Sequence, residues 1–279
     1  MKFQKFLLSL LILFTLISCS EKQEKISIIK EDNLENQMIE AYNEGLEEFN
    51  KGDIFFAVKK FNEVELLYPQ SIWAPRSNLM AAYAFYSSLY FNDAIYELER
   101  FLEKYKNHPN TDYAYYLLAI CHYNQIVDEK KDLGEIIKAK NYFNLLIEKY
   151  PDTDFAEDAR FKLELIDEIL AYKELYLANY YLSREKWIPA MNRYKRIVNQ
   201  YETTIFIEEA LFRLVELNFK IGLEHEAKKY ASLLGYNYQS SEWYERSYKI
   251  LNKNYKKKEF NKDLNEKENL LKRFKKLFD

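Results

Sequence analysis

A repeating pattern of one small residue and two large ones constrains the fold of this chain more than any other feature. In each occurrence an alanine is followed four residues later by a large apolar residue and about seven residues later by another. The fifth occurrence is weaker, because a second alanine replaces the first large residue. The occurrences are Ala57-Phe61-Val64, Ala94-Leu98-Phe101, Ala139-Phe143-Ile147, Ala190-Tyr194-Val198 and Ala227-Ala231-Leu234.

Packing of paired helices explains this pattern. A small residue early in the second helix lets the first helix approach closely, and the two large residues fill the gap from the same face. A small residue is then expected about twelve positions before the anchor alanine. The residues at this place, with an inserted loop allowed for in the third unit, are Gly45, Ala82, Ala119, Ala178 and, as the exception, Val215.

The spacing of the units indicates the fold class. The anchor alanines are 37, 45, 51 and 37 residues apart, close to the 34-residue tetratricopeptide length with insertions. Pro69, Pro109 and Pro151 follow three of the units, where a proline ends a helix. The chain is therefore predicted to be all-α, an α/α superhelix (solenoid) of about five tetratricopeptide-like helix pairs.

Composition and charge agree with this fold and exclude one class of partner. Only five glycines and five prolines occur, which favours helices over the turn-rich β-sandwiches. The net charge of −3 is unevenly spread, with +5 in residues 253–279 and −10 in residues 19–252. An acidic body argues against nucleic acid as a partner.

The N-terminus has the layout of an export signal. Two lysines precede an apolar run at positions 6–17, which is too short to span a bilayer. The run ends in Leu-Ile-Ser-Cys, which resembles the bacterial lipobox, and this predicts a signal peptide at 1–18 and lipidation of Cys19. The alternative is an ordinary signal peptide with a chance cysteine. Ser20 resembles the residue that sorts lipoproteins to the outer membrane, and the polar residues 19–37 are predicted to be a tether.

Motifs for catalysis or metal binding are missing from the sequence. The three histidines, His108, His122 and His225, have no partner at metal-ligand or catalytic spacing. Cys121 precedes His122 directly, which separates the two side chains by about 100° on a helix. Cys121 is left alone once Cys19 is lipidated, and its apolar surroundings predict a core thiol. We therefore expect no enzyme activity, no cofactor and no metal.

A specific likeness lies in residues 75–116, PRSNLMAAYAFYSSLYFNDAIYELERFLEKYKNHPNTDYAYY. Together with the lipobox and the helix pairs, this stretch resembles the BamD (ComL) family of outer-membrane lipoproteins, and a weaker likeness covers residues 42–251. The resemblance implies a scaffold of the β-barrel assembly machinery. Its partners would be a BamA-like barrel subunit, other assembly lipoproteins and unfolded outer-membrane proteins with a C-terminal aromatic residue. The insertion in the third pair is shorter than in some members, and the basic tail has no counterpart that we can place.

Aromatic residues on the first helices of pairs one to three predict a groove for such client peptides. Rigid rings on a concave face grip an extended peptide with little loss of entropy. The alternative is that the rings pack between neighbouring helices. The predicted groove residues are Tyr42, Leu46, Phe49, Leu79, Tyr83, Tyr86, Tyr113, Tyr116, Ile120 and Tyr123.

The family resemblance leaves pairs four and five for docking of the assembly partner. Tryptophan and arginine are frequent anchors of interfaces, and the candidates here are Trp187, Arg193, Arg196 and Arg213. Residues 253–279 are predicted to form an amphipathic helix that packs on the body, lies on anionic lipid or grips a partner. Its apolar stripe is Phe260, Leu264, Leu271, Phe274 and Phe278.

Two other functions share part of these features. Another periplasmic tetratricopeptide lipoprotein, such as a cell-division coordinator or a pilus-assembly pilotin, would have the same anchor and repeats. A peptidoglycan-processing enzyme would need a catalytic motif, which the sequence lacks. The predicted organisation is a signal peptide (1–18), a lipidated tether (19–37), a repeat domain (38–252) and a basic helical tail (253–279).

Overall fold

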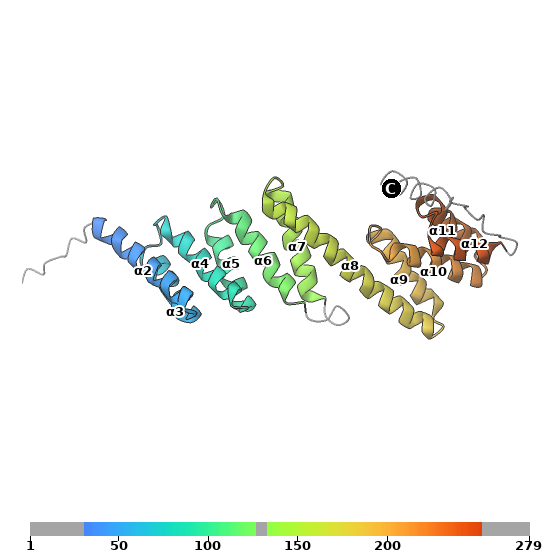
Figure 1. The fold of residues 1–279 in the computed structure, drawn as a ribbon, viewed down its shortest axis with the longest axis horizontal. Coiled ribbons are helices and arrows are strands. Elements are labelled where there is room, and N and C mark those ends of the chain that lie inside the picture. Colours follow the sequence, from blue (N-terminus) through green and yellow to red (C-terminus); the bar gives the residue numbers. More distant parts are fainter. Residues whose placement is uncertain (1–30, 127–132, 253–279) are drawn as a thin grey trace, which may run out of the picture. The chain divides into compact units, whose positions relative to one another are not determined.

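The computed structural model describes residues 31–126 and 133–252, and in these two ranges every regular element is a helix (Figure 1). The predicted all-α fold of five helix pairs is confirmed, with a further helix after the fifth pair. The predicted tail helix, the signal peptide and most of the tether lie outside the described residues. The helices are α2 (Glu31–Lys51), α3 (Ile54–Leu67), α4 (Trp73–Ser87), α5 (Phe91–Lys104), α6 (Thr111–Asn124), α7 (Gly134–Lys149), α8 (Asp154–Ser183), α9 (Trp187–Gln200), α10 (Ile207–Lys220), α11 (Glu224–Asn237) and α12 (Glu242–Leu251).

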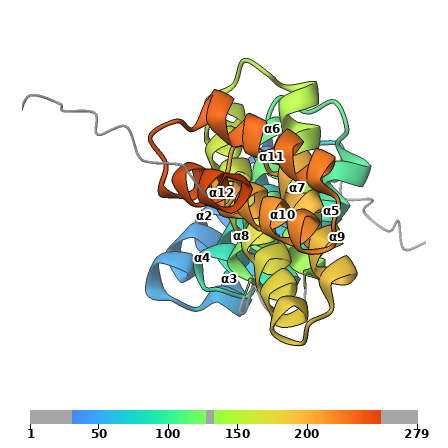
Figure 2. The same cartoon turned by 90° about the vertical axis from the view of Figure 1, so that its right-hand side faces the viewer.

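The chain divides into two units, residues 1–80 and 81–279, which we describe separately. In the first unit α2 packs against α3, and α2 begins at Glu31, inside the range that we expected to be a tether. In the second unit each helix from α5 to α12 packs against the next one along the chain (Figures 1 and 2). This unit is therefore a stack in which neighbours in sequence are neighbours in space, as in repeat proteins.

The anchor alanines form the centre of each helix pair, and all five are fully buried. The residues seven positions after them are also fully buried: Val64, Phe101, Leu146, Ile197 and Leu234. Our assignment of Ile147 and Val198 to this place was wrong, since both lie at the eighth position and are only partly buried. Seven residues bring a helix back to within about 20° of the same face, whereas eight rotate it by about 80°.

The small residues twelve positions before the anchors lie where the paired helices touch. A Cβ atom on Gly45 would come within 2.7 Å of Phe61 Cε1, closer than the packed ring allows. Ala82, Ala119 and Ala178 are fully buried at the corresponding places, and Val215 shows that the fifth pair accommodates a larger residue. The predicted small-residue contact is therefore present in the first four pairs.

A left-handed residue five positions before the anchor reverses the chain in four pairs. These residues are Gly52, Leu89, Glu185 and Gly222, with φ of 86°, 65°, 56° and 84°. The backbone N–H of each donates to the carbonyl three residues earlier, at 3.0–3.1 Å. The next N–H reaches the carbonyl five residues back, the pattern that closes helix C-termini. Glycine adopts this conformation without strain, but Leu89 and Glu185 do not.

A tyrosine eleven positions after each anchor ends the second helix of every pair. Its backbone N–H donates to the carbonyl of the buried seventh-position residue, at 2.8–3.0 Å. The regular repeat therefore runs from twelve residues before the anchor to eleven after it. The tyrosines are Tyr68, Tyr105, Tyr150, Tyr201 and Tyr238.

The helix α8 is the irregular element of the second unit. It has 30 residues, whereas α6 and α10 have 14 each, and this length accounts for the 51-residue gap between the third and fourth anchors. Thr153 caps its start by accepting a hydrogen bond from the N–H of Ala156 at 3.2 Å. No glycine or proline interrupts residues 154–183, so nothing in this stretch ends the helix early.

Candidate functional site

In the first unit the predicted groove residues pack within the helix pair. The ring of Tyr42 lies 5.5 Å from that of Phe61 and 5.1 Å from that of Trp73, and burial raises the pKa of Tyr42. Leu46 and Phe49, on the same helix, are partly buried. Tyr42 therefore packs α2 against its neighbours, and all three side chains expose only part of their surface.

In the second unit five tyrosines from α4 and α6 form what we call the aromatic face: Tyr83, Tyr86, Tyr113, Tyr116 and Tyr123. Tyr83 is the most open of them, with 36% of its surface exposed, and its ring lies 6.4 Å from that of Tyr86. Burial raises the pKa of Tyr113 to about 12, and the nearby phenols of Tyr83 and Tyr86 add to this effect. The phenols of Tyr83 and Tyr86 on α4 thus lie near that of Tyr113 on α6.

The start of α8 holds the α6 part of the aromatic face. The hydroxyl of Tyr116 donates a hydrogen bond of 2.8 Å to Asp158 Oδ2. Burial is the main cause that raises the pKa of Tyr116, and this hydrogen bond is the second. The ring of Phe155 lies 5.1 Å from Tyr116 and 5.4 Å from Tyr113. Tyr113 and Tyr116 are thus packed against a neighbouring helix and still partly exposed.

Two of the predicted groove residues are buried. Leu79 is 7% exposed and Ile120 is 6% exposed. Ile120 belongs to a core cluster that also contains Phe143 and Ile166. Leu79 and Ile120 therefore offer almost no surface to a ligand in this conformation, although they lie on the same sides of α4 and α6 as the partly exposed tyrosines.

The four residues predicted for partner docking, which we call the docking set, lie on α9 and α10. Arg193 and Arg196 both bind Glu174 of α8, at 3.1 Å from its carboxylate oxygens. Arg213 instead pairs with Glu209 and Glu216 on its own helix, at 3.4 and 3.0 Å. The ammonium of Lys220 lies 4.6 Å above the Trp187 ring. The arginines are therefore already paired within the chain, but Arg196 keeps 54% of its side chain exposed.

Cys121 and His122 are both buried in the second unit. Cys121 is fully buried, and burial raises the pKa of its thiol to about 12, which confirms a core thiol. His122 is stacked on Tyr142 and donates from Nδ1 to Glu135 Oε2 at 2.6 Å. Burial of Glu135 works to raise its pKa, but the hydrogen bonds from His122 and Lys138 outweigh burial and lower it. His122 therefore ties α6 to the start of α7 and does not face Cys121.

One apolar surface was missed by the sequence reasoning, a row of side chains along α8 that we call the α8 stripe. Its members recur at spacings of three and four residues, which places them within about 100° of one another on the helix. This spacing was visible in the sequence, but α8 was expected to be an ordinary repeat helix. The α8 stripe consists of Phe161, Leu165, Ile169, Tyr172, Tyr176 and Tyr180.

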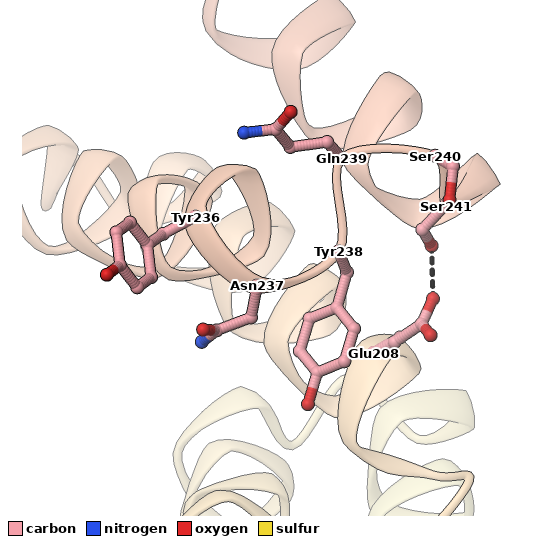
Figure 3. Close-up of a pocket in the computed structure, with 7 residues that line it drawn as sticks. All are labelled: Glu208, Tyr236, Asn237, Tyr238, Gln239, Ser240 and Ser241. Atoms are coloured by element: carbon pink, nitrogen blue, oxygen red, sulfur yellow. Dashed lines mark hydrogen bonds between the residues drawn. The ribbon is translucent and has the colours of Figure 1, made fainter.

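A shallow hollow at the turn between α11 and α12 is lined by Glu208 of α10 and residues 236–241 (Figure 3). The Ser241 hydroxyl donates to Glu208 and accepts from the N–H of Trp243, so it caps α12. Tyr236, although 85% exposed, points away from this contact (Figure 3). The hollow is therefore a by-product of the way in which α12 is capped.

No cluster of three or more metal-ligating side chains occurs within 31–126 and 133–252. Within the same ranges no helix is long and apolar enough to cross a membrane. Cys19, the predicted lipidation site, lies outside the described residues.

Comparison with known proteins identifies close relatives. The sequence model of a family described as YfiO, an outer membrane lipoprotein, matches residues 34–234. "Outer membrane protein assembly factor BamD" of Caulobacter vibrioides is 35% identical over 246 residues, which are 88% of this chain and 80% of the relative. The protein of the same name from Rickettsia prowazekii is 33% identical over 256 residues, 91% of this chain and 99% of the relative.

Among solved structures, the TPR2AB domain of yeast Sti1, in a complex with pHSP90, is similar with a TM-score of 0.41. Its sequence is 13% identical, and the match covers 77% of this chain and 82% of that one.

Proposed function

The chain belongs to the BamD family of outer membrane protein assembly factors, and from this membership we propose that it is a lipid-anchored scaffold of the β-barrel assembly machinery. The role is one of binding, without catalysis, cofactor or metal. Family membership favours this role over a cell-division coordinator, a pilus-assembly pilotin or a peptidoglycan-processing enzyme.

The observation that carries the proposed client site is the aromatic face. Its five tyrosines gather on two adjacent helices, and each ring keeps part of its surface exposed while a neighbouring side chain fixes its orientation. Rings held in this way lose little entropy when a ligand binds. A peptide with alternating aromatic residues and an aromatic C-terminus suits such a surface. In the first unit, a second and separate candidate for client contact consists of Tyr42, Leu46 and Phe49.

Binding of a synthetic client peptide tests this site. A peptide that ends in an alternating aromatic strand is expected to bind, and removal of its last aromatic residue weakens binding by about 1–2 kcal/mol. Tyr83→Ala weakens binding by a similar amount, because Tyr83 is the most exposed ring of the face. Tyr96→Ala is the matched control, since Tyr96 is an exposed tyrosine on α5 outside the face. Equal affinity for both peptides contradicts the client role.

The docking set is the proposed contact for a BamA-like barrel subunit, with other assembly lipoproteins as further partners. Arg196 uses one nitrogen for Glu174, and its remaining N–H donors are available to an acidic partner. Arg196→Glu is expected to lower co-purification of the barrel subunit from solubilised membrane about tenfold or more. The exposed neighbour Lys195 provides the control Lys195→Glu. Undiminished co-purification with Arg196→Glu excludes this surface.

The membrane anchor is proposed to be a lipid on Cys19. Each buried methylene contributes about 0.8 kcal/mol, so two or three acyl chains hold a protein on a membrane. Cys19→Ala is expected to move the protein from the outer-membrane pellet to the soluble periplasm. Sedimentation of this variant with the membrane would show that another part of the chain, or a partner, retains it.

A further inference from the structure

The α8 stripe is an extended apolar surface with little cover in the second unit. Phe161 is 59% exposed, Leu165 49%, Tyr180 46% and Tyr176 45%. The opposite side of the helix is occupied, because Asp167 pairs with Lys140 of α7 and Glu174 pairs with Arg193 of α9. In the middle of the stripe Ile169 packs against a core cluster and the Phe206 ring lies 5.8 Å from that of Tyr172, while at its end the Tyr181 ring lies 5.7 Å from that of Tyr180.

The stripe matches one segment of the same chain in length. From Phe161 to Tyr180 it extends for about 28 Å along the helix axis. The apolar residues of the C-terminal tail recur at spacings of 4, 7, 3 and 4 from Phe260 to Phe278, which predicts one helical face about 27 Å long. Two apolar rows of equal length can cover each other along their whole extent.

Charge favours the same pairing. Residues 154–183 carry seven acidic and three basic side chains, whereas residues 253–279 carry ten basic and five acidic ones. Glu157 and Glu164, on one edge of the stripe, are exposed. Lys162 and Arg184, on the other edge, lie over the rings of Tyr123 and Tyr180. The apolar contact is thus the main attraction, and the opposite net charges add to it.

The tail also starts within reach of α8. The structure ends with α12, which packs on α10, while Phe206 at the start of α10 touches α8. Two helix spacings of about 10 Å each separate such elements, and 27 residues span up to about 90 Å when extended. A tethered segment meets such a surface at a millimolar effective concentration.

We propose that residues 260–278 dock on the α8 stripe of the same chain as an amphipathic helix. The tail thereby covers apolar side chains of α8 that the described helices leave exposed. This contact is independent of the proposed client and partner sites.

Hydrogen exchange of the tail amides tests the proposal. The mature chain with Cys19→Ser is used, so that neither lipid nor detergent is present. Amides of residues 260–278 are expected to exchange about tenfold more slowly than in an isolated peptide of the same sequence. Phe161→Asp combined with Leu165→Asp raises the exchange to within about twofold of the peptide. Tyr236→Asp, at a more exposed aromatic position on α11, leaves the protection unchanged.

Three results overturn the proposal. If the tail amides of the unaltered chain exchange as fast as those of the peptide, the tail has no site on the body. The same conclusion holds if the amides become protected only when anionic vesicles are added. Protection that survives the double substitution places the tail on another surface. Protection that grows with protein concentration indicates a second copy. A thermal melt of each variant in the chain truncated after Asn252, where both residues are exposed, is expected to be unchanged and shows that the body remains folded.

Discussion

The first helices of pairs three and four, α6 and α8, both carry aromatic side chains, but their surroundings differ. The tyrosines of α6 are covered in part by Phe155 and Asp158 at the start of α8. The C-terminal half of α8 extends beyond that contact, and Tyr176 and Tyr180 there are about half exposed. The same residue type therefore forms a supported surface on one helix and an open one on the other.

This difference shows that helix length, as well as residue type, decides what an aromatic side chain does in a helical stack. A 14-residue helix such as α6 is matched by its neighbours, so its rings gain support on one side. A 30-residue helix such as α8 presents apolar surface that neighbours of ordinary length leave uncovered. We therefore assign clients to the supported rings of α6 and α4, and the chain's own tail to the α8 stripe.

The largest expected effect is on the free energy of unfolding, and it distinguishes a buried side chain beneath α6 from an exposed one on α8. Phe143 is fully buried and its ring lies 6.4 Å from Tyr116 and 6.5 Å from Tyr123. Phe143→Ala is expected to lower the free energy of unfolding by about 3–5 kcal/mol, through lost burial and the cavity left behind. Phe161→Ala in the C-terminally truncated chain changes it by about 0.5 kcal/mol or less. Denaturant unfolding measures both, and equal losses would remove the distinction between the helices.

A smaller effect concerns the hydrogen bond that ties α6 to α8. Tyr116→Phe removes the donor to Asp158 and is expected to lower the free energy of unfolding by about 0.5–1 kcal/mol. The cost is modest because water can reach the Asp158 carboxylate, which is 42% exposed. Tyr180→Phe on the α8 stripe is the control and is expected to cost nothing measurable. A larger loss for Tyr180→Phe would mean that its hydroxyl has a partner.

The smallest effect lies where the two helices end. Glu185 follows α8 with φ of 56°, whereas Gln125 ends α6 with an ordinary φ of −87°. Glu185→Gly relieves left-handed strain, partly offset by the greater freedom of glycine in the unfolded chain, and is expected to stabilise the protein by about 0.5 kcal/mol. Gln125→Gly has no strain to relieve and is expected to destabilise it slightly. Thermal melts of the pair measure this difference, and stabilisation by both substitutions would contradict the strain argument.

Much of the fold could be predicted from the sequence, because the repeat is a local packing rule. Gly45 had to lie close to the second helix once helix pairs were assumed, and it lies against the Phe61 ring of α3. The positive φ of Leu89 and Glu185 was hidden, since neither residue favours it. The left-handed turn becomes visible only when Gly52 and Gly222 are aligned five positions before their anchors.

The candidate site was harder to predict than the fold. Tyr83 and Ile120 follow the same periodicity, but one is exposed and the other buried. How far a neighbouring helix covers a side chain depends on helix length and on the approach of the next pair, which a single sequence does not encode locally. The α8 stripe escaped notice because a regular repeat, with Ala178 at the small-residue place, would have begun this helix about one half later.

The central claim is that clients bind the aromatic face, and photo-cross-linking of a bound client peptide to the full chain tests it most directly. A photoreactive group replaces the C-terminal aromatic residue of the peptide, and the cross-linked segments are identified by mass spectrometry. The account predicts adducts on residues 83–86 and 113–123, which competing unlabelled peptide removes. Adducts confined to α3 or to the α8 stripe, with none on α4 or α6, would contradict it.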